Sequence, residues 1–215
     1  MNNIFLKVAL GAAFLTTVAI GAQAQKTYTE GVITYSIKSS MGDADSKVSF
    51  RGDSSSSSSQ YGPAVVKLIS TAKGNYFAVL VNVPVASIKK AAVLTPDELD
   101  QANAAAPKFT FTPTTETKQI NGFNCKKVTV KDSKGTSFDA WVTNDIVAPQ
   151  NLMSKYFEGA GGFPVQFATM QQGQQVSVIL KSISDEKVPA GTFGIPAGYD
   201  KITYEELMAM SGKRQ

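Results

Sequence analysis

Apolar and polar residues alternate over much of the chain from residue 31 onward, and this alternation predicts β-strands. Ile33, Tyr35 and Ile37 fall on one face of the first such segment. Short turn sequences join several of the later segments in pairs, which predicts β-hairpins. The segments with strand character are residues 31–37, 47–51, 65–71, 76–83, 109–112, 123–131, 136–143, 165–170 and 175–184.

Two short segments, and a weaker third, predict helices. Thr95 and Glu98 have the spacing of a capping box with proline at the first helical position, and Thr203 and Glu206 repeat that spacing near the C-terminus. A weaker pattern covers residues 151–157. With the strands, these segments predict a mainly β (α+β) fold: a strongly curved antiparallel sheet or half-barrel with two or three short covering helices.

Residues 1–24 have the organisation of a cleavable signal peptide. Lys7 is their only charged residue, residues 8–20 are apolar or small apart from two threonines, and residues 22–24 read Ala-Gln-Ala. The apolar run is shorter than the roughly 20 residues that span a bilayer. We therefore expect a single β-rich domain at residues 25–215, periplasmic or secreted and without a lipid anchor. The alternative is an uncleaved membrane anchor.

The composition argues against the commonest catalytic and metal-binding arrangements. The chain has no histidine and one cysteine, so the usual general base and the usual transition-metal ligand are missing. We expect Cys125 to be a small core residue, and we expect no metal and no cofactor. The 21 basic and 17 acidic residues are spread along the chain, which does not favour nucleic-acid binding. A hydrolase that uses serine, lysine or acidic side chains remains as an alternative.

A low-complexity segment follows the tripeptide at residues 51–53, because residues 54–59 are six consecutive serines. The tripeptide is Arg-Gly-Asp, the sequence of an adhesion motif, but tripeptides of this kind recur by chance. We interpret the whole segment as a polar turn or an edge strand. An exposed edge there would offer contacts to a partner protein.

A hydrophobic ligand site is the remaining chemical possibility. The concave face of a half-barrel needs helices to cover it, and an apolar space under such helices suits a lipid-like ligand. The competing interpretation of each aromatic residue is that it belongs to the ordinary core. The candidate residues for lining the ligand cavity are Phe109, Phe111, Phe123, Trp141, Phe167, Leu207 and Met208.

Four segments in the second half of the chain resemble the exported, uncharacterised GLPGLI-like proteins of Gram-negative bacteria. The segments are TETKQINGFNCKK at 115–127, FDAWVTNDI at 138–146, GFPV at 162–165 and FGIPAGY at 193–199. The chain departs from the family at residues 165–167, where Val-Gln-Phe stands in place of Gly-Leu-Ile. The resemblance implies a fold similar to the LolA-like lipoprotein carriers of the periplasm, with helices in the mouth of a curved sheet. It implies no established activity.

These observations lead to two principal hypotheses of function. The first is a non-enzymatic periplasmic or cell-envelope protein that binds a hydrophobic or lipid-like ligand, with a lipid or a lipidated molecule as its partner. The second is a structural or protein-interaction module of the envelope with a filled core and no ligand pocket. Both follow from the predicted export and from the missing catalytic residues.

Overall fold

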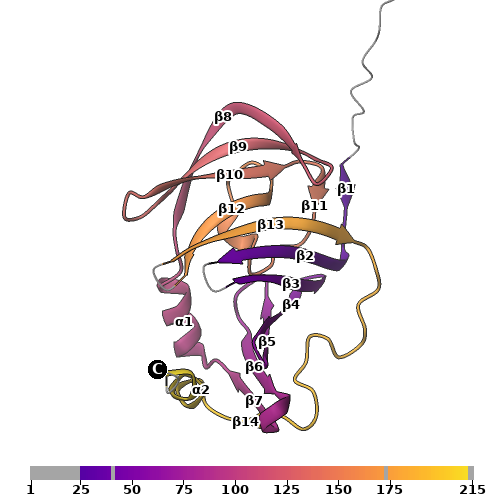
Figure 1. Cartoon of the computed structure of the whole chain (residues 1–215), viewed down its shortest axis with the longest axis vertical. Coiled ribbons are helices and arrows are strands. Elements are labelled where there is room, and N and C mark those ends of the chain that lie inside the picture. Colours follow the sequence, from indigo (N-terminus) through magenta and orange to yellow (C-terminus); the bar gives the residue numbers. More distant parts are fainter. Residues whose placement is uncertain (1–24, 40–41, 172–173, 213–215) are drawn as a thin grey trace, which may run out of the picture.

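The computed structural model describes residues 25–39, 42–171 and 174–212, and most of these residues lie in β-strands (Figure 1). The elements are β1 (Lys26–Thr27), β2 (Glu30–Ser39), β3 (Gly42–Arg51), β4 (Ser54–Tyr61), β5 (Ala64–Thr71), β6 (Phe77–Val83), η1 (Pro84–Ala86), β7 (Ile88–Val93), α1 (Pro96–Ala104), β8 (Phe109–Ile120), β9 (Phe123–Asp132), β10 (Ser137–Thr143), β11 (Ile146–Val147), η2 (Lys155–Phe157), β12 (Phe163–Gln171), β13 (Gln174–Ser184), β14 (Asp200–Lys201) and α2 (Tyr204–Gly212).

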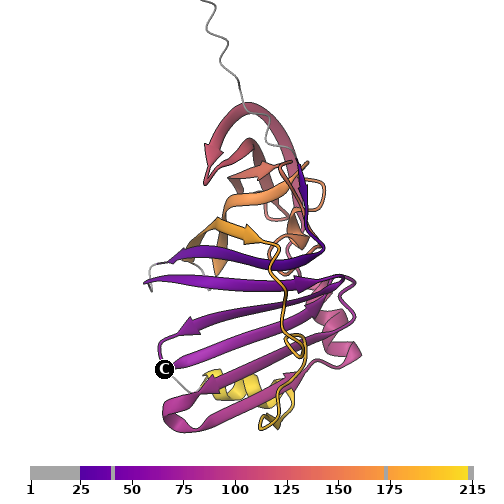
Figure 2. The same cartoon turned by 90° about the vertical axis from the view of Figure 1, so that its right-hand side faces the viewer.

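Twelve of these strands form one mixed sheet in the order β14-β7-β6-β5-β4-β3-β2-β13-β12-β10-β9-β8. Within the described chain the sheet is not closed, because β14 and β8 are its two ends. The β-rich fold with short helices is confirmed, but the antiparallel arrangement is wrong at β14, which pairs parallel with β7. The reason is that the segment after β13 crosses back over the sheet and reaches β7 in the same direction (Figure 2). A separate two-strand sheet pairs β1 with β11.

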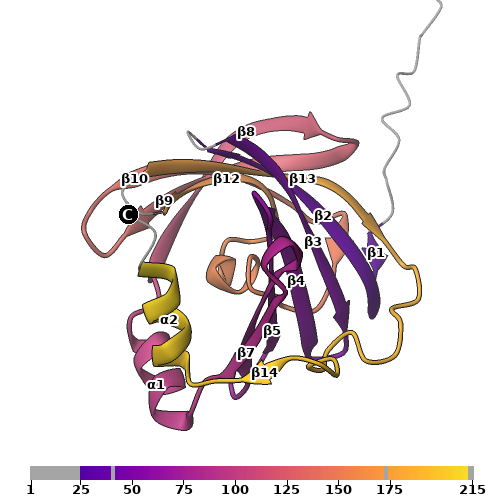
Figure 3. The ribbon, with the colours of Figure 1, turned by 60° about the horizontal axis from the view of Figure 1, so that its bottom comes forward.

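Both predicted capping boxes are present. The Glu98 N–H donates to Thr95 Oγ1 at 3.3 Å, and the Thr95 N–H donates to Glu98 Oε2 at 2.7 Å. Thr203 and Glu206 make the same reciprocal pair, at 2.7 and 3.1 Å, where α2 starts. These bonds satisfy N–H groups that have no partner within a helix, which fixes where each helix begins. In Figure 3 α1 and α2 both lie at the end of the sheet that carries β7 and β14.

The third predicted helix is largely replaced by a turn. Residues 151–157, which we call the η2 segment, contain only the single 3₁₀ turn η2. The Asn151 Oδ1 accepts hydrogen bonds from the N–H groups of Met153 and Ser154 at 2.9 and 3.1 Å. This side chain takes the place of helical backbone bonding, as asparagine does in turns. In Figure 3 the η2 segment lies beside β4 and β5, under β12.

The larger hydrophobic cluster lies on one face of the main sheet, which we call the inner face. Residues opposite each other in paired antiparallel strands share a face, so β2 and β3 contribute alternate residues to it. The η2 segment adds Phe157, which is buried against the cluster. The fully buried members from β2 and β3 are Ile33, Tyr35, Val48 and Phe50.

A smaller cluster lies on the opposite, outer face, over β5, β6 and β7. The register shows this, because Ser57 pairs with the inner-face residue Val48 on one side and with Leu68 on the other. Successive residues of a strand point to opposite faces, so Ile69 points outward. The segment between β13 and β14 covers this cluster (Figure 2). The buried members are Ile69, Ala78, Leu80 and Ala91, and the covering residues include Phe193, Ile195 and Tyr199.

The run of serines forms β4, which is a central strand. It pairs along its length with β3 on one side and with β5 on the other. The turn at Gly52 and Asp53 is confirmed, but the edge strand is wrong. Backbone pairing does not depend on the serine side chains, and the flanking strands supply the apolar bulk. The three residues Ser55, Ser56 and Ser57 are buried as a result.

Candidate functional site

A cavity of about 580 Å³ lies on the inner face, beside the packed cluster. We call it the inner cavity. Its lining comes from β2 to β6, β13, α1, the η2 segment and the start of α2. The sheet therefore forms one side, and the short elements that cover the sheet form the other.

Serine hydroxyls form the part of this sheet side that lies over β3, β4 and β5. The register brings the residues together, since Ser46 pairs with Ser59, and Ser55 pairs with Ser70. The Ser59 hydroxyl donates to Ser46 Oγ at 3.0 Å, and the Oγ atoms of Ser55 and Ser70 are also 3.0 Å apart. Ser57 lies between these two pairs. We call the five residues the serine patch; all except Ser55 line the cavity.

Ser57 differs from the other members of the serine patch. The residue is only 8 % exposed and it lines the inner cavity. Among the described residues, no side chain or backbone group makes a hydrogen bond with its hydroxyl. The Ser57 hydroxyl is not one of the fully buried side-chain atoms without a partner, so it is open to the cavity rather than sealed in the core. It is therefore available to a molecule in the cavity.

The rest of the cavity wall is mostly apolar. Leu68 and Phe77 extend from the sheet, Leu99 from α1, and Met153 and Tyr156 from the η2 segment. Apolar and aromatic walls with a few convergent polar groups are typical of small-molecule sites. The wall as a whole matches a ligand that has an apolar body.

The inner cavity carries little charge. Among the described lining residues, Lys155 is the only lysine, arginine, aspartate or glutamate, and its ammonium group lies 4.9 Å from the centre of the Tyr156 ring. No aspartate or glutamate is among the lining residues of the cavity. Among the described residues that line the cavity, no histidine or carboxylate is present to accept a proton from a serine hydroxyl.

The aromatic residues predicted to line a ligand cavity meet in the packed cluster. Phe109, Phe111 and Phe167 surround Phe157, with ring centres 6.2, 5.9 and 4.6 Å from that ring. Such tilted aromatic contacts are typical of a filled core. None of these three residues lines the inner cavity.

The other four predicted residues are dispersed. Phe123 and Trp141 are partly buried against the same cluster, and the Lys118 ammonium lies 4.1 Å from the centre of the Trp141 ring. In α2, Leu207 is buried whereas Met208 is 51 % exposed. These four residues do not line the inner cavity either. Contact between any of the seven and a ligand stays a prediction.

Sequence reasoning missed the serine patch. It treated residues 54–59 as one polar tract, whereas a strand divides such a tract between its two faces. The signal that was available is the pair of turns that flank the tract, Gly52–Asp53 and Gly62–Pro63, because a segment between two hairpin turns has neighbours on both sides.

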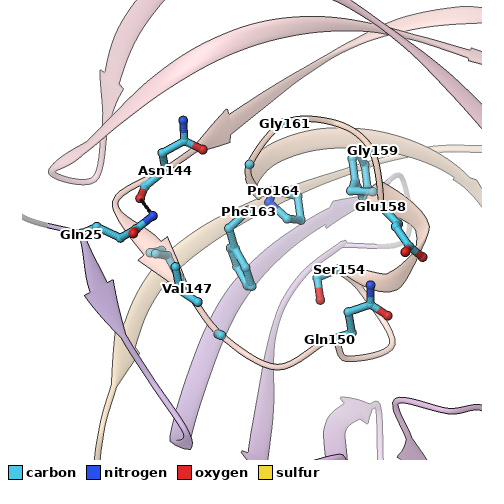
Figure 4. Close-up of a pocket in the computed structure, with 14 residues that line it drawn as sticks. Gln25, Asn144, Val147, Gln150, Ser154, Glu158, Gly159, Gly161, Phe163 and Pro164 are labelled. Atoms are coloured by element: carbon cyan, nitrogen blue, oxygen red, sulfur yellow. Dashed lines mark hydrogen bonds between the residues drawn. The ribbon is translucent and has the colours of Figure 1, made fainter.

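A second cavity, of about 340 Å³, lies near the first described residue (Figure 4). At the border of this cavity, the Gln25 Nε2 donates a hydrogen bond of 2.9 Å to the Asn144 carbonyl oxygen. The glycine-rich loop at residues 159–162 and Phe163 supply another part of its wall. Among the described residues that line this cavity, Glu158 is the only charged one.

Two buried groups with potential reactivity are inert in this fold. Cys125 is 1 % exposed, and its burial, followed by the nearby Asp145 carboxylate, raises the pKa of the thiol to about 11. The thiol is therefore protonated at neutral pH and is a poor nucleophile. Burial likewise raises the pKa of Tyr35. The expectation that Cys125 is a core residue is confirmed.

Two negative findings concern the described part of the chain. It contains no group of three or more histidine, cysteine, aspartate or glutamate side chains placed to hold a metal ion. None of its helices has the length and apolar character needed to cross a membrane. The predicted signal peptide at residues 1–24 lies outside the described residues.

Comparisons with known proteins place the chain in a sequence family. The family described as "Domain of unknown function (DUF4412)" matches residues 29–199. An uncharacterised conserved protein from Thermus thermophilus is similar in structure, with 6 % identity, a TM-score of 0.49, and coverage of 81 % of this chain and 90 % of that one. MucB is similar with 10 % identity and a TM-score of 0.32, over 82 % of this chain and 60 % of its own. A comparison with curated proteins finds no match.

Proposed function

Since the chain belongs to the DUF4412 family of domains of unknown function, we propose from its own site that it is a non-enzymatic cell-envelope protein that binds a hydrophobic or lipid-like ligand in the inner cavity. The observation that carries this proposal is the cavity itself. Its volume of about 580 Å³ falls within the range of small-molecule sites, roughly 300–1,000 Å³. Its wall is mostly apolar and aromatic, with the serine patch, Thr71, Asn103 and Lys155 as the polar residues apart from the tyrosines.

The location and the finer fold belong to the same proposal. We propose that residues 1–24 direct export and are removed, and that residues 25–215 form one domain in the periplasm or outside the cell. The sheet would then be a strongly curved half-barrel of the LolA-like type, with α1, α2 and the η2 segment at its mouth. The GLPGLI-like segments described above support this assignment by resemblance.

The alternative of an interaction module without a pocket loses its main support. It relied on an exposed edge at residues 54–59, but β4 is paired on both sides. The inner cavity also contradicts a fully filled core. Ligand binding is therefore the function that the site supports best.

Native mass spectrometry of the protein purified from its own periplasm tests this proposal. We expect a co-purifying lipid-like molecule, and we expect that molecule to displace an apolar fluorophore from the delipidated protein. The variant Ala102→Trp places a large ring in the cavity and is expected to weaken fluorophore binding at least about tenfold. Ala104→Trp, on the same helix but outside the lining, is the matched control. Absence of both a co-purifying molecule and fluorophore binding would contradict the proposal.

A further inference from the structure

We propose that the serine patch binds the uncharged, hydrogen-bonding head group of an amphiphilic ligand, with Ser57 as its direct contact. This inference rests on the proposed function, since it concerns the same inner cavity. It adds the chemical class of the ligand, namely an apolar chain that carries hydroxyl, ester or amide groups at one end. It also adds the orientation, with the head group against β4.

The first argument is the state of the Ser57 hydroxyl. Ser57 lies on a central strand and is 8 % exposed, its hydroxyl is open to the cavity, and the described residues make no hydrogen bond with it. A hydroxyl can donate one hydrogen bond and accept two. A ligand group that enters the cavity can therefore both donate to Ser57 and accept from it.

The second argument is the pair of serines on each side of Ser57. In each pair one hydroxyl donates to the other, at 3.0 Å for Ser59 and Ser46 and at 3.0 Å between Ser55 and Ser70. The accepting hydroxyl of each pair keeps its own proton, so Ser46 retains a donor for the cavity. The patch is thus a row of neutral donors and acceptors rather than a single polar atom.

The third argument is the charge of the wall. None of the described residues that line the cavity is a carboxylate, so they offer no ion pair to a cationic head group. The one cation, Lys155, belongs to the η2 segment and lies 4.9 Å from the Tyr156 ring, whereas the hydroxyl row belongs to the sheet. The groups that converge on the sheet side are neutral, and they match a neutral head group.

The apolar residues fix where the chain of the ligand lies. Leu99 of α1 and Met153 and Tyr156 of the η2 segment line the cavity from the elements that cover the sheet. A head group at Ser57 leaves the chain to contact these residues, which buries apolar surface on both partners. The geometry therefore points to an amphiphile whose head contacts the sheet and whose chain contacts α1 and the η2 segment.

Calorimetric titration of the delipidated protein with two twelve-carbon probes tests the inference. The probes are 1-monolauroylglycerol, whose head is neutral and rich in hydroxyls, and lauric acid, whose head is anionic at pH 8. For Ser57→Ala we expect the Kd for 1-monolauroylglycerol to rise about 3- to 10-fold, the loss of one or two hydrogen bonds. We expect a smaller change in the Kd for lauric acid. Ser57→Thr, which keeps the hydroxyl, should restore binding of 1-monolauroylglycerol.

Ser56→Ala is the matched control. Ser56 lies on the same strand and is 4 % exposed, but it points to the outer face and does not line the cavity. We expect its Kd values to equal those of the wild type, and thermal unfolding should show that all variants fold.

The possible failures are distinguishable. If neither probe binds the wild type, the proposed function itself is wrong. If 1-monolauroylglycerol binds but Ser57→Ala binds it equally well, the cavity holds a ligand and the role of the serine patch is overturned. If lauric acid binds more tightly than 1-monolauroylglycerol and Lys155→Met abolishes that binding, the head group is anionic and the inference is overturned.

Discussion

The inner face of β3 and the inner face of β4 are direct neighbours, yet one is packed and the other borders a cavity. Val48 and Phe50 of β3 are fully buried in the larger cluster. On β4 the partner of Val48 is Ser57, which lines the cavity, and the partner of Phe50 is Ser55, which is buried and does not line it. Valine fills the space above its position in the sheet, whereas the smaller Ser57 leaves that space open. The comparison teaches that the size of the side chains at paired positions on neighbouring strands decides whether the space above the sheet is filled by the core or left as a cavity. The fold of the two strands is the same.

Removing bulk on the packed side should have the largest effect. We expect Phe50→Ala to lower the free energy of unfolding by about 3–5 kcal/mol, because it leaves a void in a region where neighbours cannot collapse. Urea denaturation with an unchanged m-value measures this loss. Ser57→Ala, at a cavity-lining position of the neighbouring strand β4, is the control and should cost far less. Equal losses at the two positions would abolish the distinction between the packed and open regions.

The outer face of the sheet offers a second test, because the segment between β13 and β14 packs there. Its loss can be compared with the loss of packing on the inner face. Glu30 holds that segment: it accepts from the Val188 N–H at 3.0 Å, from the Lys187 ammonium at 3.1 Å and from Arg51 Nε at 2.9 Å. The guanidinium carbon of Arg51 in turn lies 5.5 Å from the centre of the Phe193 ring. We expect Glu30→Gln to release the segment and to destabilise the protein by less than Phe50→Ala does. Faster amide hydrogen exchange in β7 would report the release.

The same carboxylate gives this effect a pH dependence. The hydrogen bond from Val188, followed by the Lys187 ammonium, holds the pKa of Glu30 below its ordinary value of 4.5. The stabilisation is therefore complete above that value and is lost as the pH falls through the lower, folded-state pKa. We expect the stability difference between wild type and Glu30→Gln to be constant near neutral pH and to shrink as the pH falls from the ordinary value of 4.5 through the lower pKa of folded Glu30. A difference that grows on acidification would contradict this role of Glu30.

The sequence predicts the strands and the helix starts well because both signals are local. Alternation defines β2 from Ile33, Tyr35 and Ile37, and the side chains of Thr95 and Glu98 complete a capping box within one turn. The site is not local in this sense. The serine patch depends on which strand lies beside β4, and pairing between strands is not written in any single segment.

The predicted aromatic residues also show that the sequence does not reveal which residues border the cavity. Phe109, Phe111 and Phe167 have the chemistry of a ligand cavity, but hydrophobicity alone does not distinguish a residue that packs against Phe157 from one that borders a space. The covering elements decide that distinction. Met153 and Tyr156 reach the cavity because the η2 segment is a turn held by Asn151 rather than the expected helix.

We expect the smallest effect on stability from a larger side chain that fills part of the inner cavity. This change is also the sharpest test of whether the region beside β4 is open. Ser57→Val replaces the hydroxyl that faces the cavity with a methyl group and adds a second methyl group, and valine favours strands. We expect the free energy of unfolding to change by less than about 1 kcal/mol, with an increase rather than a loss, as measured by urea denaturation. Ser56→Val, on the outer face of the same strand, is the control. It separates the effect of strand propensity on stability from the effect of filling the cavity. A loss of more than about 2 kcal/mol in Ser57→Val alone would mean that Ser57 is as tightly packed as its partner Val48, and that the cavity has no room beside it.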